Sequence, residues 1–262
     1  MDKVNIYSLD VKKKETISKP KVFEVKPRKD LIQKAVEISQ SRKKQIQGRD
    51  SRAGLRNTAE SWGTGHGLSR APRLKGSGYP TARNVGRVPY AKGGRRTHPI
   101  KVEKKIVKKM NKKTKLQALI SALSASGDVL WVEKRGHIIS NIPEIPLVVD
   151  DKIQTIKKTE QIYSVLCKFG LQEELNKVKT NKKIRAGKGK RRGRKYKKRK
   201  GVLFVIKDDF GIVKASRNIP GAEIVKFNDL SIDNLAPGGL PGRLILWTQS
   251  AFNELNKYEE NI

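Results

Sequence analysis

The stretch from Gln47 to Lys101 places the strongest limit on how this chain can fold, because it cannot supply a hydrophobic core. It has few large aliphatic residues and much glycine and arginine. No acidic residue occurs from Ser61 to Val102, an interval that holds nine Lys or Arg and eight Gly. Neither helical nor strand periodicity runs through it. Such a segment buries too little apolar surface to offset its chain entropy. We therefore predict that 47–101 is an extension that becomes ordered only on a partner.

The aliphatic runs lie on either side of this extension, in 1–46 and 102–262, and they are spaced like the elements of one globular α/β domain. Short, continuous apolar runs alternating with helical segments predict a layered, mostly parallel sheet with flanking helices. The predicted strands are Val4–Leu9, Val22–Val25, Val129–Val132, Leu147–Val149, Gly201–Ile206, Glu223–Val225 and Leu244–Trp247. The predicted helices are one that begins at Asp30, then Thr114–Ala125, Thr159–Phe169, Glu173–Lys179 and Gln249–Tyr258. The first 45 residues are too few to fold alone, so we expect them to join the sheet of the C-terminal part.

Charge narrows the class of partner. Lys and Arg number 59 against 25 Asp and Glu, a formal net charge of +34, which causes strong self-repulsion unless a polyanion is bound. No apolar run approaches the roughly 18 to 20 residues that span a membrane, and the first ten residues do not resemble a secretory signal. The single cysteine, Cys167, fits a reducing cytosol and lies in an apolar helical stripe where we expect it to pack. One cysteine and three histidines argue against structural zinc. Nucleic acid is the expected partner.

Within the extension, arginine outnumbers lysine, and aromatic rings alternate with the charge. Guanidinium groups bind phosphate oxygens in pairs, and rings hold the unstacked bases of RNA loops. The side chains predicted to bind RNA are Arg49, Arg52, Arg56, Trp62, Arg70, Arg73, Lys75, Tyr79, Arg83, Arg87, Tyr90, Lys92, Arg95, Arg96 and His98. The alternative is a flexible low-complexity linker, but linkers seldom combine Arg, Pro and aromatic residues so densely.

A second basic segment, Lys179–Lys200, contains fourteen Lys or Arg and no acid. It precedes a predicted strand, so we expect a loop at one edge of the sheet. Its glycines permit close approach of the backbone to phosphates, and Tyr196 offers a face for stacking. The predicted RNA-binding cations here are Arg185, Lys188, Lys190, Arg191, Arg192 and Arg194. The alternative is a solvated charge run or a localisation signal.

No motif has the context that catalysis needs. The glycine-rich run Gly63–Gly67 has no strand before it and no apolar helix after it. Gly187–Lys190 lacks the spacing and the Ser or Thr of a phosphate-binding loop. His137 follows a turn with no acid nearby in sequence. Asp150–Asp151 are interpreted as the N-terminal acids of a helix. Asp208–Asp209 are interpreted as a turn after a strand.

Several segments in combination resemble one known family, large ribosomal subunit protein four, in its archaeal and eukaryotic branch. The segments that carry the resemblance are Ser61–Arg73 (SWGTGHGLSRAPR), Gly93–Pro99 (GGRRTHP), Lys109–Lys113 (KMNKK), Ile184–Arg194 (IRAGKGKRRGR), Asn218–Ala222 (NIPGA) and Leu235–Gly239 (LAPGG). The match runs nearly from end to end. The absence of a long basic tail after Tyr258 favours the archaeal form.

The resemblance implies an α/β domain on the outer surface of the large ribosomal subunit. It also implies an extension that passes through large-subunit ribosomal RNA toward the peptide exit tunnel and aids assembly. Arg185 to Lys200 would contact this RNA near the globular domain. The tip nearest the tunnel wall would be Gly63, Thr64, Gly65 and His66. The family often carries Arg at the position of His66. Histidine is only partly protonated near neutral pH, so this tip carries less positive charge than one with Arg.

The partners implied are large-subunit ribosomal RNA, neighbouring proteins of the subunit and the nascent peptide, in a cytoplasmic ribosome. No cofactor, metal, membrane or homo-oligomer is expected. One alternative is a general nucleic-acid-binding protein of the nucleoid type. Another is an α/β enzyme acting on RNA, such as a methyltransferase, which would need a nucleotide-binding loop after the first strand. Leu9–Pro20 (LDVKKKETISKP) does not supply one.

Overall fold

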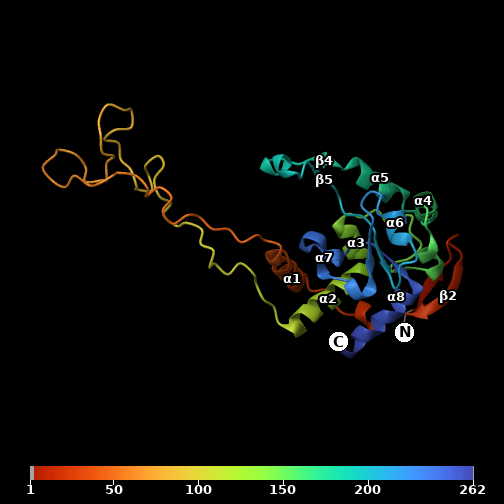
Figure 1. The fold of residues 1–262 in the computed structure, drawn as a ribbon. Coiled ribbons are helices and arrows are strands. Elements are labelled where there is room, and N and C mark those ends of the chain that lie inside the picture. Colours follow the sequence, from red (N-terminus) through yellow and green to blue (C-terminus); the bar gives the residue numbers. More distant parts are fainter. Residues whose placement is uncertain (1–2, 262) are drawn as a thin grey trace. The chain divides into compact units, whose positions relative to one another are not determined.

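A computed structural model describes residues 3–261 of the chain, which divides into two units. The globular unit comprises Met1–Gln40 and Lys109–Ile262, and the arm comprises Ser41–Lys108. By sequence, the predicted extension 47–101 lies wholly inside the arm. The arm leaves the globular unit through one helix, α1 (Lys29–Arg42), and returns to it just before another, α2 (Lys112–Ser126) (Figure 1). It is therefore a loop whose two ends are both tied to the globular unit.

The globular unit is built on a six-stranded sheet with the strand order β2-β1-β3-β8-β6-β7. Its strands are β1 (Lys3–Tyr7), β2 (Lys13–Ser18), β3 (Leu147–Val149), β6 (Leu203–Ile206), β7 (Glu223–Lys226) and β8 (Ile245–Thr248). All neighbouring strands pair in parallel except β2, which runs antiparallel to β1. Because β1 pairs with β3, the N-terminal residues join the sheet of the C-terminal part. The predicted α/β class is confirmed.

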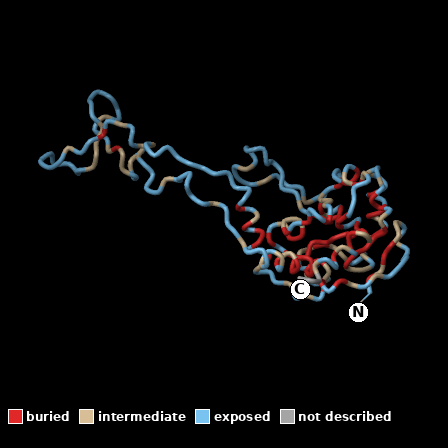
Figure 2. The backbone as a smooth tube through the Cα atoms, turned by 60° about the horizontal axis from the view of Figure 1, so that its bottom comes forward, coloured by how far each residue is buried: buried red, intermediate tan, exposed pale blue. Residues whose placement is uncertain are grey.

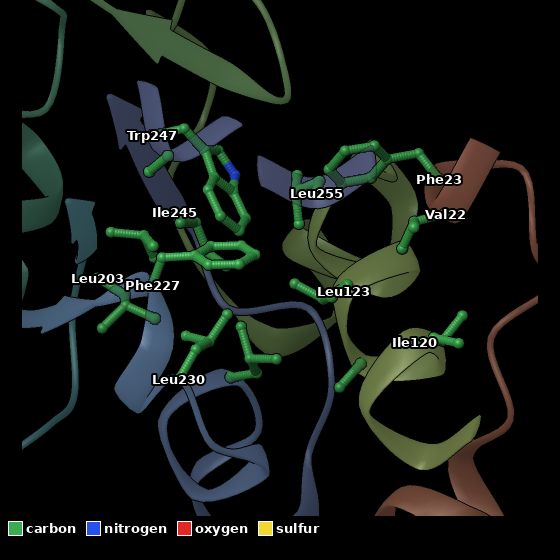
Figure 3. Close-up of a cluster of buried hydrophobic side chains, with 14 of the residues drawn as sticks. Val22, Phe23, Ile120, Leu123, Leu203, Phe227, Leu230, Ile245, Trp247 and Leu255 are labelled. Carbon is green, nitrogen blue, oxygen red and sulfur yellow. The ribbon is translucent and has the colours of Figure 1, made fainter. Parts of the chain in front are cut away.

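Helices cover both faces of this sheet (Figure 1). Side chains alternate along each central strand, so that Leu203 and Val205 enter one core while Phe204 and Ile206 enter the other. The first core is closed by α1, α2, α7 (Ile232–Leu235) and α8 (Gln249–Asn253). The second is closed by α3 (Val129–Arg135), α4 (Thr159–Lys168), α5 (Gln172–Thr180) and α6 (Ile212–Ser216). Figure 3 shows the first core, with Trp247 among its side chains. The continuous apolar runs in the sequence follow from burial on both faces.

The strand predicted at Val22–Val25 is wrong. Lys21–Phe23 forms a single 3-10 turn, η1, after Pro20. Val22 and Phe23 are both buried in the first core, and Phe23 stacks on Phe252 with ring centroids 5.8 Å apart. Two consecutive residues of a strand would point to opposite faces of the sheet. A turn lets both side chains reach the same core.

The strand predicted at Val129–Val132 is also wrong, because this run forms the helix α3. The carboxylate of Asp128 accepts a hydrogen bond from the N–H of Leu130 at 2.9 Å and caps the first turn. Gly136, with φ of 89°, ends the helix in the left-handed conformation. These two caps outweigh the preference of the two valines for extended backbone.

Two further differences concern elements that carry little apolar signal. Strand β2 was not predicted, since its sequence KKETIS is exposed except for partial burial of Ile17. It is a charged edge strand, which resists pairing with other sheets. The helix predicted at Gln249–Tyr258 divides into α8 and a 3-10 segment, η6 (Glu254–Asn261).

Candidate nucleic-acid interface

Most residues of the arm are exposed (Figure 2). Residues 43–108 are described throughout and contain no helix or strand, only two isolated bridges. Both bridges involve Arg73, which pairs with Glu60 and with Val85. Backbone hydrogen bonds run in both directions between Glu60 and Arg73, at 3.0 and 2.9 Å. Three stretches of the arm therefore meet at Arg73.

Side chains support this meeting point. The guanidinium of Arg87 donates to the side-chain and backbone oxygens of Asn57, at 3.1 and 2.7 Å. Ala59 is fully buried in the arm, and a Cβ added at Gly86 would lie 3.0 Å from its methyl group. We call the region of Asn57, Ala59, Arg73, Gly86 and Arg87 the arm centre. In the arm centre, the arginine side chains therefore form contacts that stabilise the arm itself.

The predicted RNA-binding residues of the arm divide into two groups. Some are engaged within the arm: Arg73 donates to the carbonyl of Arg83 at 3.1 Å, Arg56 pairs with Asp50 at 2.7 Å, and Lys75 pairs with Glu60 at 2.6 Å. The others are exposed, and their side chains have no ion pair or hydrogen bond within residues 3–261; they are Arg49, Arg52, Arg70, Arg83, Lys92, Arg95 and Arg96. The second group has its donors available for an external anion.

The aromatic residues of the arm differ in how open they are. Tyr90 is 78% exposed, and His98 is also exposed. The hydroxyl of Tyr79 donates to the carbonyl of Lys75, which closes a tight loop. The rings of Tyr90 and His98 are therefore accessible to an external partner.

The predicted tip is a closed turn. Gly63, Thr64, Gly65 and His66 are all exposed, and Gly63 and Gly65 adopt positive φ. The half-buried ring of Trp62 meets His66 edge-on, with centroids 5.8 Å apart. Beside the turn, the hydroxyl of Ser61 donates to the carbonyl of Arg70 at 2.8 Å.

The second basic segment is a small hairpin of its own instead of the predicted loop at a sheet edge. Strands β4 (Lys183–Ile184) and β5 (Tyr196–Lys197) pair antiparallel, and the turn between them contains a 3-10 segment, η3 (Lys188–Arg192). Arg185 is half-buried and donates to the carbonyl of Arg194 at 3.1 Å. This self-pairing explains how so charged a segment holds a defined backbone.

The other predicted cations of the hairpin are exposed, without a side-chain ion pair or hydrogen bond in the described part of the chain; they are Lys188, Lys190, Arg191, Arg192 and Arg194. Tyr196 is 46% exposed, and two lysines lie near its ring. The ammonium of Lys182 lies over its ring, 4.6 Å from the centroid, and that of Lys195 lies 5.6 Å away. A base stacking on the face that a lysine covers would have to displace that lysine.

The groups considered for catalysis have structural roles. Asp150 caps the 3-10 turn η2 (Asp151–Thr155) and pairs with Lys14 at 3.0 Å. Asp209 accepts from the N–H of Gly211 at 2.9 Å. Cys167 is only half-buried on α4. Within residues 3–261, no group of three His, Cys, Asp or Glu side chains could hold a metal ion. The same residues include no helix with the length and apolarity to cross a membrane.

Sequence reasoning missed Arg217, which lies outside both basic segments. It lines one cavity of the globular unit together with cations of the second basic segment, Lys179, Lys182, Lys198, Arg199 and Lys200. The sequence does contain one indication that Arg217 belongs to the site. Arg217 directly precedes Asn218–Ala222, one of the segments that carry the family resemblance.

Together these features define a class, a basic α/β protein whose unpaired cations are concentrated on exposed segments of little regular structure. Comparison with known proteins gives the family. The model of the Ribosomal protein L4/L1 family matches residues 18–258, and the chain belongs to this family.

Curated archaeal relatives span almost the whole chain, and each is called large ribosomal subunit protein uL4. The relative from Methanopyrus kandleri is 40% identical over 252 residues, covering 96% of this chain and 97% of the relative. That from Methanococcus aeolicus is 42% identical over 256 residues, covering 97% and 99%. That from Methanococcus maripaludis strain C6 is 44% identical over 254 residues, covering 97% and 98%.

Proposed function

We propose that this chain is a structural protein of the large ribosomal subunit that binds its ribosomal RNA through the arm and the basic hairpin. Its membership of the family supports the structural role, and as a ribosomal protein it is not an enzyme. The observation that carries the RNA-binding role is the row of exposed, unpartnered arginines in an interval free of acidic residues. The location that follows is the cytoplasmic ribosome.

The mechanism is electrostatic and steric. Where RNA helices converge, their phosphates repel one another, and arginine forks reduce that repulsion by pairing with phosphate oxygens. The arm centre already joins three stretches of the arm, so less chain entropy has to be lost on binding. In this way the chain aids assembly of the RNA around it.

At the tip, Gly63, Thr64, Gly65 and His66 line part of the peptide exit tunnel. Their exposure and the two positive-φ glycines support this role, since a narrow turn fits a crowded RNA surface. Neighbouring proteins of the subunit and the nascent peptide are the further partners.

Sedimentation tests the main proposal. A tagged chain expressed in its source cells should move with large subunits in a sucrose gradient and remain with them after DNase treatment. Release by DNase would favour the nucleoid-type alternative. Large subunits that are complete and active in cells lacking the chain would refute the structural role.

The tip is tested separately with a photoreactive amino acid at His66. Ribosomes stalled during synthesis should give a crosslink between this position and the nascent chain. Crosslinks to ribosomal RNA alone would contradict the tunnel role and leave RNA binding intact.

A further inference from the structure

A cavity of about 440 Å³ opens in the globular unit beside the basic hairpin. Its walls come from the end of α5, from 198–200 after the hairpin and from the turn that follows α6. The volume lies within the range of ligand pockets. Six Lys or Arg residues line it, against one carboxylate, Glu223.

Backbone hydrogen bonds and close packing define the backbone around the cavity. The N–H of Gly201 donates to the carbonyl of Gly221 at 2.9 Å, and the N–H of Glu223 donates to that of Val202 at 3.1 Å. Gly221 has φ of 75°, and a Cβ added there would lie 2.5 Å from a methyl group of Val178. The turn therefore packs against α5 with no room for a side chain at Gly221.

The charge in the cavity is unbalanced. Glu223 already accepts from the buried guanidinium of Arg243 at 2.7 Å and pairs with Lys200. By contrast, the side chains of Lys179, Lys198 and Arg217 have no ion pair or hydrogen bond within residues 3–261. Three cations with free donors at one cavity form a site for a phosphate group.

Part of the lining is apolar, which a phosphate alone would leave unfilled. Pro220 is exposed and Ala222 is half-buried, whereas Val178 and Ile219 are almost fully covered, with 3% and 4% of their surfaces exposed. A site with both free cations and an apolar floor matches a nucleotide, which has a charged backbone and a flat base. Folded RNA offers such unstacked nucleotides in loops and bulges, whereas duplex DNA keeps its bases stacked.

We propose that this cavity receives one unstacked nucleotide of the RNA that the chain binds. Its phosphate pairs with Arg217 and Lys179, and its base lies against Pro220 and Ala222. The inference rests on the proposed function, since it adds a pocket for a single nucleotide to a protein proposed to bind ribosomal RNA. It extends the interface to Arg217, outside both basic segments.

The test uses the full-length chain, large-subunit ribosomal RNA and ultraviolet crosslinking, with adducts located by mass spectrometry. The wild type should carry a nucleotide adduct between residues 217 and 223 in addition to adducts in the arm. Asn218 is exposed and lines the cavity. Asn218→Trp should fill the cavity and abolish the first adduct while those of the arm persist.

A charge reversal gives a second measurement with a matched control. Arg217→Glu should weaken RNA binding on the order of tenfold and bring the log–log salt slope about 1 closer to zero. Lys214→Glu changes the net charge equally three residues earlier, at an exposed position of α6 outside the cavity, and should weaken binding less than about threefold.

The outcomes separate this inference from the proposed function. Adducts in the arm with none at 217–223, together with equal effects of the two charge reversals, would overturn the nucleotide pocket and leave RNA binding standing. A wild-type chain that neither binds the RNA nor forms any adduct would overturn both.

Discussion

The ring nitrogen Nδ1 of His137 lies 2.7 Å from a carboxylate oxygen of Glu174, and both side chains are buried, 1% and 0% exposed. The second oxygen of Glu174 accepts from the N–H of Ile138 at 3.1 Å. Nearby, Lys177 donates to the carbonyl of Gly136 at 2.9 Å, which further ties α5 to the end of α3. The contact thus joins two helices that cover one face of the sheet.

Replacing Glu174 with Ala should destabilise the globular unit by about 3 kcal/mol, because His137 and the N–H of Ile138 would lose their buried partner. Urea unfolding followed by circular dichroism measures this. Glu173→Ala removes the neighbouring, exposed carboxylate and should change stability by less than about 0.5 kcal/mol. Equal effects of the two substitutions would show that the buried contact contributes little.

The same pair predicts loss of stability in acid. Burial lowers the pKa of His137 below 6.5, and the carboxylate of Glu174 only partly opposes this shift. Burial alone would raise the pKa of Glu174, but hydrogen bonds from His137 and Ile138, together with charge interactions with His137 and Arg199, outweigh it and hold that pKa below 4.5. For both groups the unfolded state binds more protons, so stability falls as pH decreases. The loss of stability due to His137 occurs below about pH 6.5, and that due to Glu174 occurs below about pH 4.5.

The free energy of unfolding should therefore decrease between about pH 7.5 and pH 5.5, by no more than about 1.4 kcal/mol per pH unit from one proton. His137→Asn should flatten this dependence. His98→Asn, at an exposed histidine of the arm, should leave it unchanged. If the His137 variant kept the wild-type slope, another group would be responsible.

Limited proteolysis of the free chain should cut first between Gln47 and Lys101, since that backbone is exposed and has no helix or strand. The N-terminal and C-terminal fragments should still elute together in size exclusion, because β1 pairs with β3. Added ribosomal RNA should slow the cleavage. Cutting at equal rates along the whole chain would contradict the division into two units.

RNA binding should depend steeply on salt. If on the order of 10 phosphates are neutralised, the log–log slope of affinity against salt is about −7 to −9. Changing Arg70, Arg73, Arg95 and Arg96 to Ala should bring the slope about 3 closer to zero and impair incorporation into subunits. Changing Lys12, Lys13, Lys158 and Lys214 to Ala removes the same charge from exposed positions of the globular unit and should have a smaller effect. A wild-type slope between zero and −2 would refute the electrostatic mechanism.

Two glycines of the arm offer a test of its internal order. A Cβ added at Gly54 would lie 2.4 Å from the backbone of Gly94, whereas one added at Gly63 would meet nothing within 4 Å. Both glycines have positive φ, so alanine strains the backbone at each. Gly54→Ala should additionally separate the two stretches and speed hydrogen exchange at the N–H of Arg95, which donates to Arg87. An increase of about fivefold corresponds to 1 kcal/mol. The Gly63→Ala variant should not show it.

The sequence predicted the sheet class because burial on both faces leaves continuous apolar runs such as LFVI in β6. It did not separate strand from helix at Val129–Val132, where caps at Asp128 and Gly136 decide the conformation. Nor could it predict β2, whose exposed residues carry no apolar pattern.

The candidate site was predictable in composition but not in contacts. A run of arginines indicates an anion-binding surface, yet it does not reveal that Arg73 and Arg87 hold the arm centre. His137 and Glu174 are 37 residues apart, and the cavity joins Lys179 to Arg217 across two helices. Such pairings depend on the tertiary fold, which local sequence patterns do not encode.

Both ends of the arm are anchored in the globular unit. The arm is therefore a loop, and any opening that it passes through must hold two lengths of polypeptide. Half of its 68 residues, fully extended, reach no more than about 120 Å. Suppose that a polynucleotide folds into a closed ring before it meets this protein. The arm could then enter that ring only through an opening wide enough for two polypeptide backbones and their side chains. A single free tail could instead thread through end-first at any time. If the arm binds ribosomal RNA as proposed, the anchored loop would favour early arrival, with later-forming RNA helices wrapping over a polypeptide already in place.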